Sequence, residues 1–125
     1  MAKAKRDEDR EERISMEIVV DAYGAEEQAM GWYYYLEDQL QFPFTAVCTQ
    51  KRAISPLKIG DEVDVIGMGP EEECEREVFV NIRWDRDGLL AVPLSQLTPI
   101  SEMAEQTREA VEDWHYWNEM GYEFG

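Results

Sequence analysis

The chain has 125 residues, of which 44% are hydrophobic and 11% aromatic, and it carries a formal net charge of −16. This composition is typical of one folded domain and excludes an acidic disordered chain, which would contain few aromatic residues. The charge argues against binding to nucleic acid or anionic lipid, and it favours metal ions or basic partners.

The sequence shows no sign of secretion or membrane insertion. No stretch approaches 18 consecutive apolar residues, and the first residues are charged, without the apolar run of a secretory signal. The two cysteines, Cys48 and Cys74, are too few for a disulfide scaffold and form no CxxC motif. We therefore predict a cytoplasmic protein with both thiols reduced and no contact with membranes.

The N-terminal part divides into a charged end and a helical segment. Residues 1–13 contain five basic and five acidic side chains, which predicts a charged and frayed N-terminus. Residues 14–42 form the predicted helical N-terminal segment, with apolar positions at helical spacing from Ala25 to Leu40 and a stop at Pro43. Residues 14–23 are compatible with either a helix or a strand, because Ile18, Val19 and Val20 are good strand formers.

Residues 43–100 have the pattern of a small β domain. Short strands are expected at 44–49, 61–66, 74–84 and 89–94, with a loop over the acidic run at 71–73 and one 3₁₀ turn at 95–97. Asp87-Gly88 indicates a tight hairpin turn. The predicted fold is α+β: an SH3-like β-barrel of four to five short antiparallel strands, flanked by N- and C-terminal helices.

Residues 101–125 are predicted to form a C-terminal helix and a tail. Apolar residues at helical spacing run to Met120, and Gly121 ends the helix. Residues 14–125 are expected to form one compact unit.

Four separated motifs resemble a known family. They are residues 31–38 (GWYYYLED), 42–44 (FPF), 91–97 (AVPLSQL) and 113–117 (DWHYW). Together they resemble the calcium-binding family typified by the cyanobacterial calcium-binding protein that is linked to heterocyst differentiation. The resemblance extends from about residue 12 to residue 124 and implies a soluble calcium binder without an EF-hand, built on an SH3-like β domain with flanking helices.

The resemblance also bears on site residues. It implies that Asp38, the aspartate at the end of the tyrosine-rich motif, is a calcium ligand. The chain departs from the family after Trp84, where it reads Asp85-Arg86-Asp87-Gly88 in place of a shorter Asp-Gly-Arg turn. Any ligand in that hairpin would therefore have a shifted position.

The distribution of carboxylates points to the same chemistry. Residues 14–50 contain six carboxylates and no lysine or arginine, and residues 71–77 contain five glutamates and one arginine. Calcium takes six to eight oxygen ligands, so clustered carboxylates favour it. The chain has no EF-hand: with Asp85 and Asp87 at positions 3 and 5 of such a loop, Arg83 falls at position 1 and Leu94 at position 12.

Calcium ligands must then come from separated segments. The first predicted set joins the end of the tyrosine-rich helix to the acidic run, and the second lies at the head of a strand. The first set is Glu37, Asp38, Glu71, Glu72 and Glu73, and the second is Asp61, Glu62 and Asp64. Each of these residues could instead be an ordinary solvated carboxylate.

No catalytic residues and no organic cofactor are predicted. The only histidine, His115, lies among aromatic residues and is expected to be a packed, hydrogen-bonded helix residue, because no second histidine or cysteine offers zinc-site spacing. No nucleophile and base are spaced for catalysis. The sequence predicts a monomeric calcium buffer or sensor that is not an enzyme. The alternative is an acidic interaction module that binds a basic protein without metal.

Overall fold

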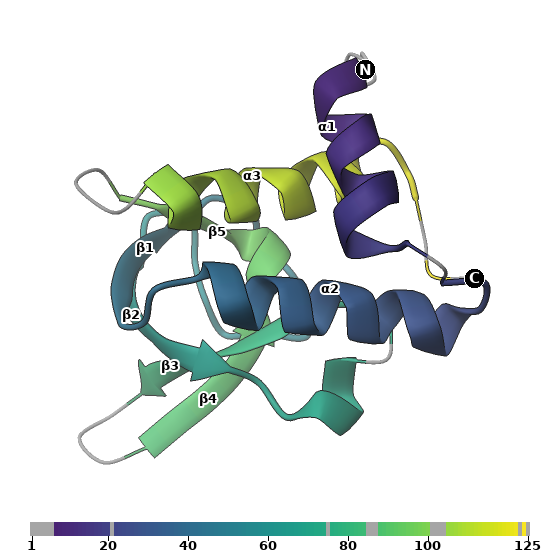
Figure 1. Cartoon of the computed structure of the whole chain (residues 1–125). Helices are drawn as coiled ribbons and strands as arrows, with labels where there is room; N and C mark the ends of the chain where they lie inside the picture. The colour runs from purple at the N-terminus through teal and green to yellow at the C-terminus, as the bar shows by residue number, and fades with distance from the viewer. Residues whose placement is uncertain are drawn as a thin grey trace.

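The computed structural model describes residues 7–20, 22–74, 76–84, 88–100, 105–122 and 124. The helices and strands follow one another in an α–β–α order (Figure 1). The helical elements are α1 (Glu8–Arg13), η1 (Ile14–Ile18), α2 (Ala25–Gln39), η2 (Glu71–Cys74), η3 (Leu94–Gln96) and α3 (Glu105–Glu119). The strands are β1 (Phe44–Cys48), β2 (Glu62–Met68), β3 (Phe79–Trp84), β4 (Gly88–Pro93) and β5 (Leu97–Pro99).

The five strands form one antiparallel sheet in the order β4-β3-β2-β1-β5. Alternation along β2 shows how the sequence sets the buried face: Val63 and Val65 are buried, whereas Glu62 and Asp64 are exposed. The α+β fold class and the flanking helices are therefore confirmed.

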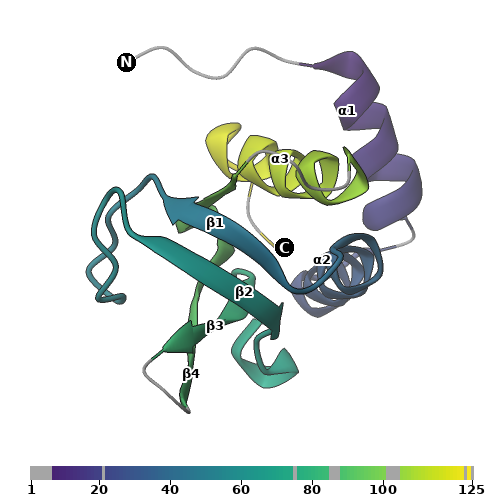
Figure 2. The ribbon, with the colours of Figure 1, turned by 90° about the vertical axis from the view of Figure 1, so that its left-hand side faces the viewer.

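The strand number agrees with the prediction of four to five strands, but the sheet is open and not closed into the predicted SH3-like barrel. In the described part of the chain, β4 and β5 are the two edges and do not pair with each other. The reason lies in the chain between them. The 3₁₀ helix η3 follows β4 directly and leads to β5, which pairs with β1 and so becomes the edge opposite β4. Figure 2 shows the strands with α1, α2 and α3 gathered on one side of them.

The core lies between this sheet and the long helices α2 and α3. Trp32 of α2 is fully buried, and its ring meets the ring of Trp114 at 5.0 Å and that of Trp117 at 5.5 Å between centroids. Such aromatic contacts bury a large apolar area in a small domain. The hydroxyl of Tyr33 donates a hydrogen bond to the carbonyl oxygen of Gly69 (2.9 Å), which joins α2 to the end of β2.

The N-terminal segment is helical from Glu8 to Ile18. Asp7 caps α1, accepting a hydrogen bond from the Arg10 amide (3.0 Å), and η1 continues the helix as a π-helix. Residues 14–18 are therefore helical, whereas residues 19, 20, 22 and 23 belong to neither a helix nor a strand. A Cβ at Gly31 would collide with the carbonyl oxygen of Ile18, so η1 and α2 approach each other closely only because residue 31 is glycine.

Two other details differ from the prediction. The acidic run expected as a loop is the 3₁₀ helix η2, which Pro70 immediately precedes, and the strand expected from Cys74 begins only at Phe79. The side chains of Cys48 and Cys74 are both buried. No helix in the described part of the chain has the length and apolar character of a membrane-spanning segment.

Candidate metal site and acidic groove

One stripe of α2 faces the acidic element η2. Glu26, Met30, Tyr34 and Glu37 are spaced by four, four and three residues, so they share one face of the helix. Residues of α2 contact η2 in the folded chain. The fold therefore brings the carboxylates of η2 opposite those of α2.

The contact between α2 and η2 runs through Tyr34. Its hydroxyl donates a hydrogen bond to Oε1 of Glu71 (3.2 Å). The negative charge of Glu71, and then that of Glu37, raises the pKa of Tyr34. Burial and the charge of Glu37 likewise raise the pKa of Tyr33. The hydrogen bond from Tyr34 therefore joins α2 to η2, and Glu37 and Glu71 both lie close enough to Tyr34 to raise its pKa.

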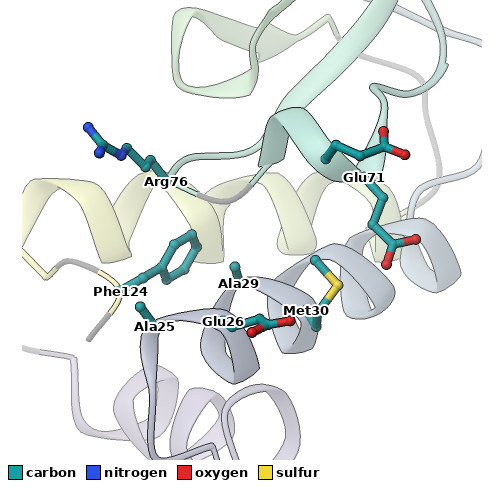
Figure 3. Close-up of a pocket in the computed structure, with 8 residues that line it drawn as sticks. Ala25, Glu26, Ala29, Met30, Glu71, Arg76 and Phe124 are labelled. Atoms are coloured by element: carbon teal, nitrogen blue, oxygen red, sulfur yellow. The ribbon is translucent and has the colours of Figure 1, made fainter.

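A groove of about 960 Å³ opens between the first half of α2 and the segment that begins with η2 (Figure 3). Its lining combines an apolar floor with an acidic rim. The lining residues are Ala25, Glu26, Ala29, Met30, Glu71, Glu72, Arg76 and Phe124. No ion pair links Glu26, Glu71 or Glu72 to any cation in the described ranges. Glu26 was not among the ligands predicted from the sequence, although its spacing to Tyr34 and Glu37 would have placed it on this face.

Asp38 lies outside this groove. Its side chain is exposed, and Oδ2 accepts a hydrogen bond from the side-chain amide of Gln39 (3.0 Å). Glu72 lines the groove beside Glu71, whereas the side chain of Glu73 lies outside the described part of the structure. The first predicted ligand set is thus divided among the groove, the end of α2 and a position that is not described.

The second predicted set has local structural contacts. Asp61 accepts a hydrogen bond from the amide of Lys58 (2.8 Å) and closes the turn before β2. Asp64 accepts one from the hydroxyl of Thr45 on the neighbouring strand β1 (3.2 Å). Glu62 is exposed on the same face of the sheet as Asp64. These contacts explain two of the three residues without a metal.

The described residues contain no group of three or more His, Cys, Asp or Glu side chains that converge closely enough to hold a metal ion. The hairpin residues 85–87, where the chain departs from the family pattern, lie outside the described part. Calcium coordination by the predicted carboxylates would therefore require their side chains to change rotamer.

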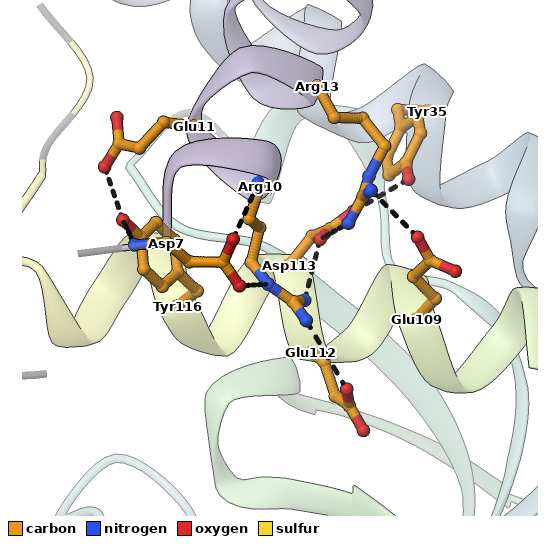
Figure 4. Close-up of polar contacts among 9 residues, drawn as sticks. All are labelled: Asp7, Arg10, Glu11, Arg13, Tyr35, Glu109, Glu112, Asp113 and Tyr116. Atoms are coloured by element: carbon orange, nitrogen blue, oxygen red, sulfur yellow. Dashed lines mark hydrogen bonds and ion pairs between the residues drawn. The ribbon is translucent and has the colours of Figure 1, made fainter. Parts of the chain in front are cut away.

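A second charged cluster surrounds Asp113 of α3, which is fully buried (Figure 4). Its Oδ1 accepts hydrogen bonds from Arg10 (2.8 Å) and Arg13 (2.6 Å), and its Oδ2 accepts them from Arg13 (3.1 Å) and the Tyr35 hydroxyl (2.9 Å). The hydrogen bond to Asp113 raises the pKa of Arg13, and burial followed by the Asp113 charge raises that of Tyr35. This cluster fastens α1 to α2 and α3, so it is part of the fold and not a ligand site.

His115 is also structural. Its Nε2 lies 2.6 Å from the carbonyl oxygen of Leu97, which connects α3 to β5. The prediction of a packed, hydrogen-bonded helix residue is confirmed.

These features define the class. It is a small α+β protein, without EF-hand geometry in its described residues, that presents carboxylate oxygens on an α-helix and a 3₁₀ helix. A family model described as calcium binding, that of the CcbP family, matches residues 12–118, and the chain belongs to this family. The resemblance seen in the sequence is therefore correct.

Two solved structures are similar over nearly the whole chain. A crystal structure of CcbP from Anabaena shares 42% identity, with a TM-score of 0.86, and the match covers 99% of this chain and 100% of that one. A calcium-binding protein in its calcium-binding form shares 41% identity with a TM-score of 0.85, again covering 99% and 100%. No curated protein shows a significant match to the chain.

Proposed function

We propose that this protein is a cytoplasmic calcium buffer or sensor that binds the ion directly through carboxylates, without an EF-hand. The observation that carries the proposal is the match to the calcium-binding family over residues 12–118. A similar protein whose structure is in a calcium-binding form supports it.

The proposed ligands come from the end of α2 and from η2. The charges of Glu71 and Glu37 both raise the pKa of Tyr34, and Glu72 lies next to Glu71 at the groove. Glutamate side chains on exposed positions have the rotamer freedom to converge on an ion, and calcium accepts irregular geometry at 2.3–2.6 Å from oxygen. Asp38, one residue beyond Glu37, joins them in the proposal as the ligand that the family resemblance implies.

The ion would act by relieving repulsion. Two carboxylates about 5 Å apart repel by roughly 3 kcal/mol at an effective dielectric of ~20. A doubly charged ion between α2 and η2 replaces that repulsion with attraction and holds η2 against the helix. The proposed site thus couples calcium occupancy to the position of the segment after Pro70.

Calorimetric titration with calcium, followed by magnesium, tests the proposal. Heat with calcium and little with magnesium is expected, because magnesium demands a tight octahedron and loses its water reluctantly. The absence of calcium binding at millimolar concentration would refute the proposal.

Variants separate the two predicted ligand sets. The double variant Glu71→Gln/Glu72→Gln and the single variant Asp38→Ala should each weaken calcium binding by about tenfold or more. Asp61→Asn/Glu62→Gln/Asp64→Asn removes charge from the second set, and Glu27→Gln is a matched control on α2 outside the groove. If only the Asp61 set weakens binding, the site lies at the head of β2 and not at η2.

A further inference from the structure

We infer that the groove between α2 and η2 is a docking site for a basic, amphipathic helix of a partner protein. Such docking goes beyond calcium binding and does not rest on it, because the groove and its charged side chains are present without a bound ion. The occupant is inferred from two properties of the groove, its apolar floor and its acidic rim.

The floor is built from α2 and the C-terminal tail. Met30 and Phe124 are partly exposed, and Ala25 and Ala29 leave space between them because their side chains are small. The Phe124 ring is held by the rings of Trp114 (6.0 Å) and Trp117 (6.4 Å), so this wall of the groove is anchored to α3. An apolar groove beside a helix is the usual site for the apolar face of another helix.

The rim selects the charge of that helix. Glu26 on one side and Glu71 and Glu72 on the other have no ion-pair partner among the cations described. Lysines flanking the apolar stripe of a partner helix would pair with them, and the net charge of −16 would speed the approach of such a partner. An acidic partner or an anionic surface would be repelled.

The volume agrees with an anchor of several side chains. At about 960 Å³, the groove is at the upper end of the 300–1,000 Å³ typical of ligand pockets. Among the described residues, Arg76 is the one cation in its lining. Its guanidinium group extends away from Glu26 and Glu71 (Figure 3), but its positive charge at the groove should still oppose a basic ligand.

Fluorescence anisotropy with a labelled synthetic peptide tests the inference. The probe is a helix-forming peptide of about 15 residues, roughly four turns, with leucines on one face and lysines beside them. Binding is measured in chelator at about 0.1 M salt, where charges still interact over about 10 Å. A scrambled peptide of equal charge, without the apolar face, is expected to bind at least tenfold more weakly.

Two triple variants separate the groove from general attraction. Glu26→Gln/Glu71→Gln/Glu72→Gln should weaken peptide binding by about tenfold or more. The control Glu27→Gln/Glu105→Gln/Glu119→Gln loses the same three charges from exposed positions outside the groove and should weaken it by less than about threefold. Equal losses in the two variants, or equal binding of the scrambled peptide, would overturn the inference.

Two single variants act in opposite directions. Met30→Ser should weaken binding several-fold, because it removes an apolar contact of the floor. Arg76→Gln should tighten binding, because it removes a like charge, and a gain of affinity is not expected from damage to the fold. Unchanged affinity in both variants, or a dimer that forms through the groove in sedimentation experiments without peptide, would overturn the inference.

Discussion

The cluster around Asp113 and the acidic groove contain the same kinds of charged side chain in opposite situations. Asp113 is fully buried and receives hydrogen bonds from two arginines and a tyrosine. The carboxylates of Glu26 and Glu72 are exposed and form no ion pair with a described cation. The chain thus uses Arg10 and Arg13 to satisfy one structural carboxylate and leaves the groove carboxylates available.

Net charge alone therefore does not identify a ligand site. A buried carboxylate must be paired, because an unpaired buried charge costs several kcal/mol, and a paired one is already fully used. Exposed carboxylates are cheap to keep unpaired in water but retain their ability to bind cations. Loss of charge should therefore damage the fold in the first region and damage binding in the second.

The largest expected effect is on the fold. Asp113→Asn should lower the free energy of unfolding by about 3 kcal/mol, because it leaves two arginines without their shared carboxylate; their partial exposure keeps the cost at the low end for buried pairs. Urea denaturation followed by circular dichroism measures it. The neighbouring control Glu112→Gln breaks only the exposed 3.6 Å contact with Arg10 and should cost less than about 1 kcal/mol. Equal costs would contradict the assignment of Asp113 as the structural acid.

Calcium should have the next largest effect, and only through the second region. At one hundred times Kd, calcium should raise the free energy of unfolding by about 2.7 kcal/mol. At the same calcium concentration, Glu71→Gln/Glu72→Gln should lose about 1.4 kcal/mol or more of this increment and keep its stability in chelator, whereas Asp113→Asn should keep the increment on a lowered baseline. Thermal unfolding with and without calcium measures both. An undiminished calcium increment in the Glu71 double variant would contradict a calcium site at η2.

Tyr35 should contribute a smaller, pH-dependent part of the stability. Its pKa is raised by burial and by Asp113, so above pH 10 the unfolded chain loses the hydroxyl proton while the folded chain retains it. The contribution of Tyr35 to the free energy of unfolding should be constant below that pH and fall as the pH rises further. Tyr35→Phe should cost about 1.5–3 kcal/mol at neutral pH, the range for a hydrogen bond to a charged group, and should make the alkaline fall shallower. An identical alkaline slope in the variant would contradict this account.

The smallest expected effect is a coupling between calcium and the basic peptide, both of which are proposed to bind at η2. Glu71 and Glu72 belong both to the proposed calcium site and to the groove rim, so calcium should weaken binding of the basic peptide by about fivefold, a coupling of about 1 kcal/mol. Peptide titrations in calcium and in chelator measure it. Because coupling is reciprocal, the peptide should weaken calcium binding by the same factor. Enhanced peptide binding in calcium would contradict a shared set of carboxylates.

Elements with a strong local pattern were predictable. The apolar spacing from Ala25 to Leu40 predicted α2, and alternation around Val63 and Val65 predicted β2. The 3₁₀ helix η2 was missed because its charge suggested a loop, although Pro70 followed by acidic residues is a typical helix start. Open edges in place of a barrel could not be predicted, because pairing between distant strands leaves no mark in either strand's own pattern.

The two charged regions differ in the same way. The groove could be predicted in part, since Glu71 and Glu72 stand in a conspicuous acidic run, and the helical spacing of Glu26 would have added a third member. The role of Asp113 could not, because its partner Arg13 is 100 positions away in the chain. Local patterns identify which side chains are exposed, whereas long-range pairing shows which of them are already satisfied.

Gly31 gives the attachment of the N-terminal segment an unusual dependence on a single missing methyl group. The carbonyl oxygen of Ile18 occupies the space that any side chain at position 31 would need. Even alanine there would wedge η1 away from α2, and the displacement would carry α1 and both of its arginines with it. The packing of η1 against α2 therefore depends on one backbone contact, between Ile18 and Gly31. Any side chain at position 31 would force η1 and α2 apart.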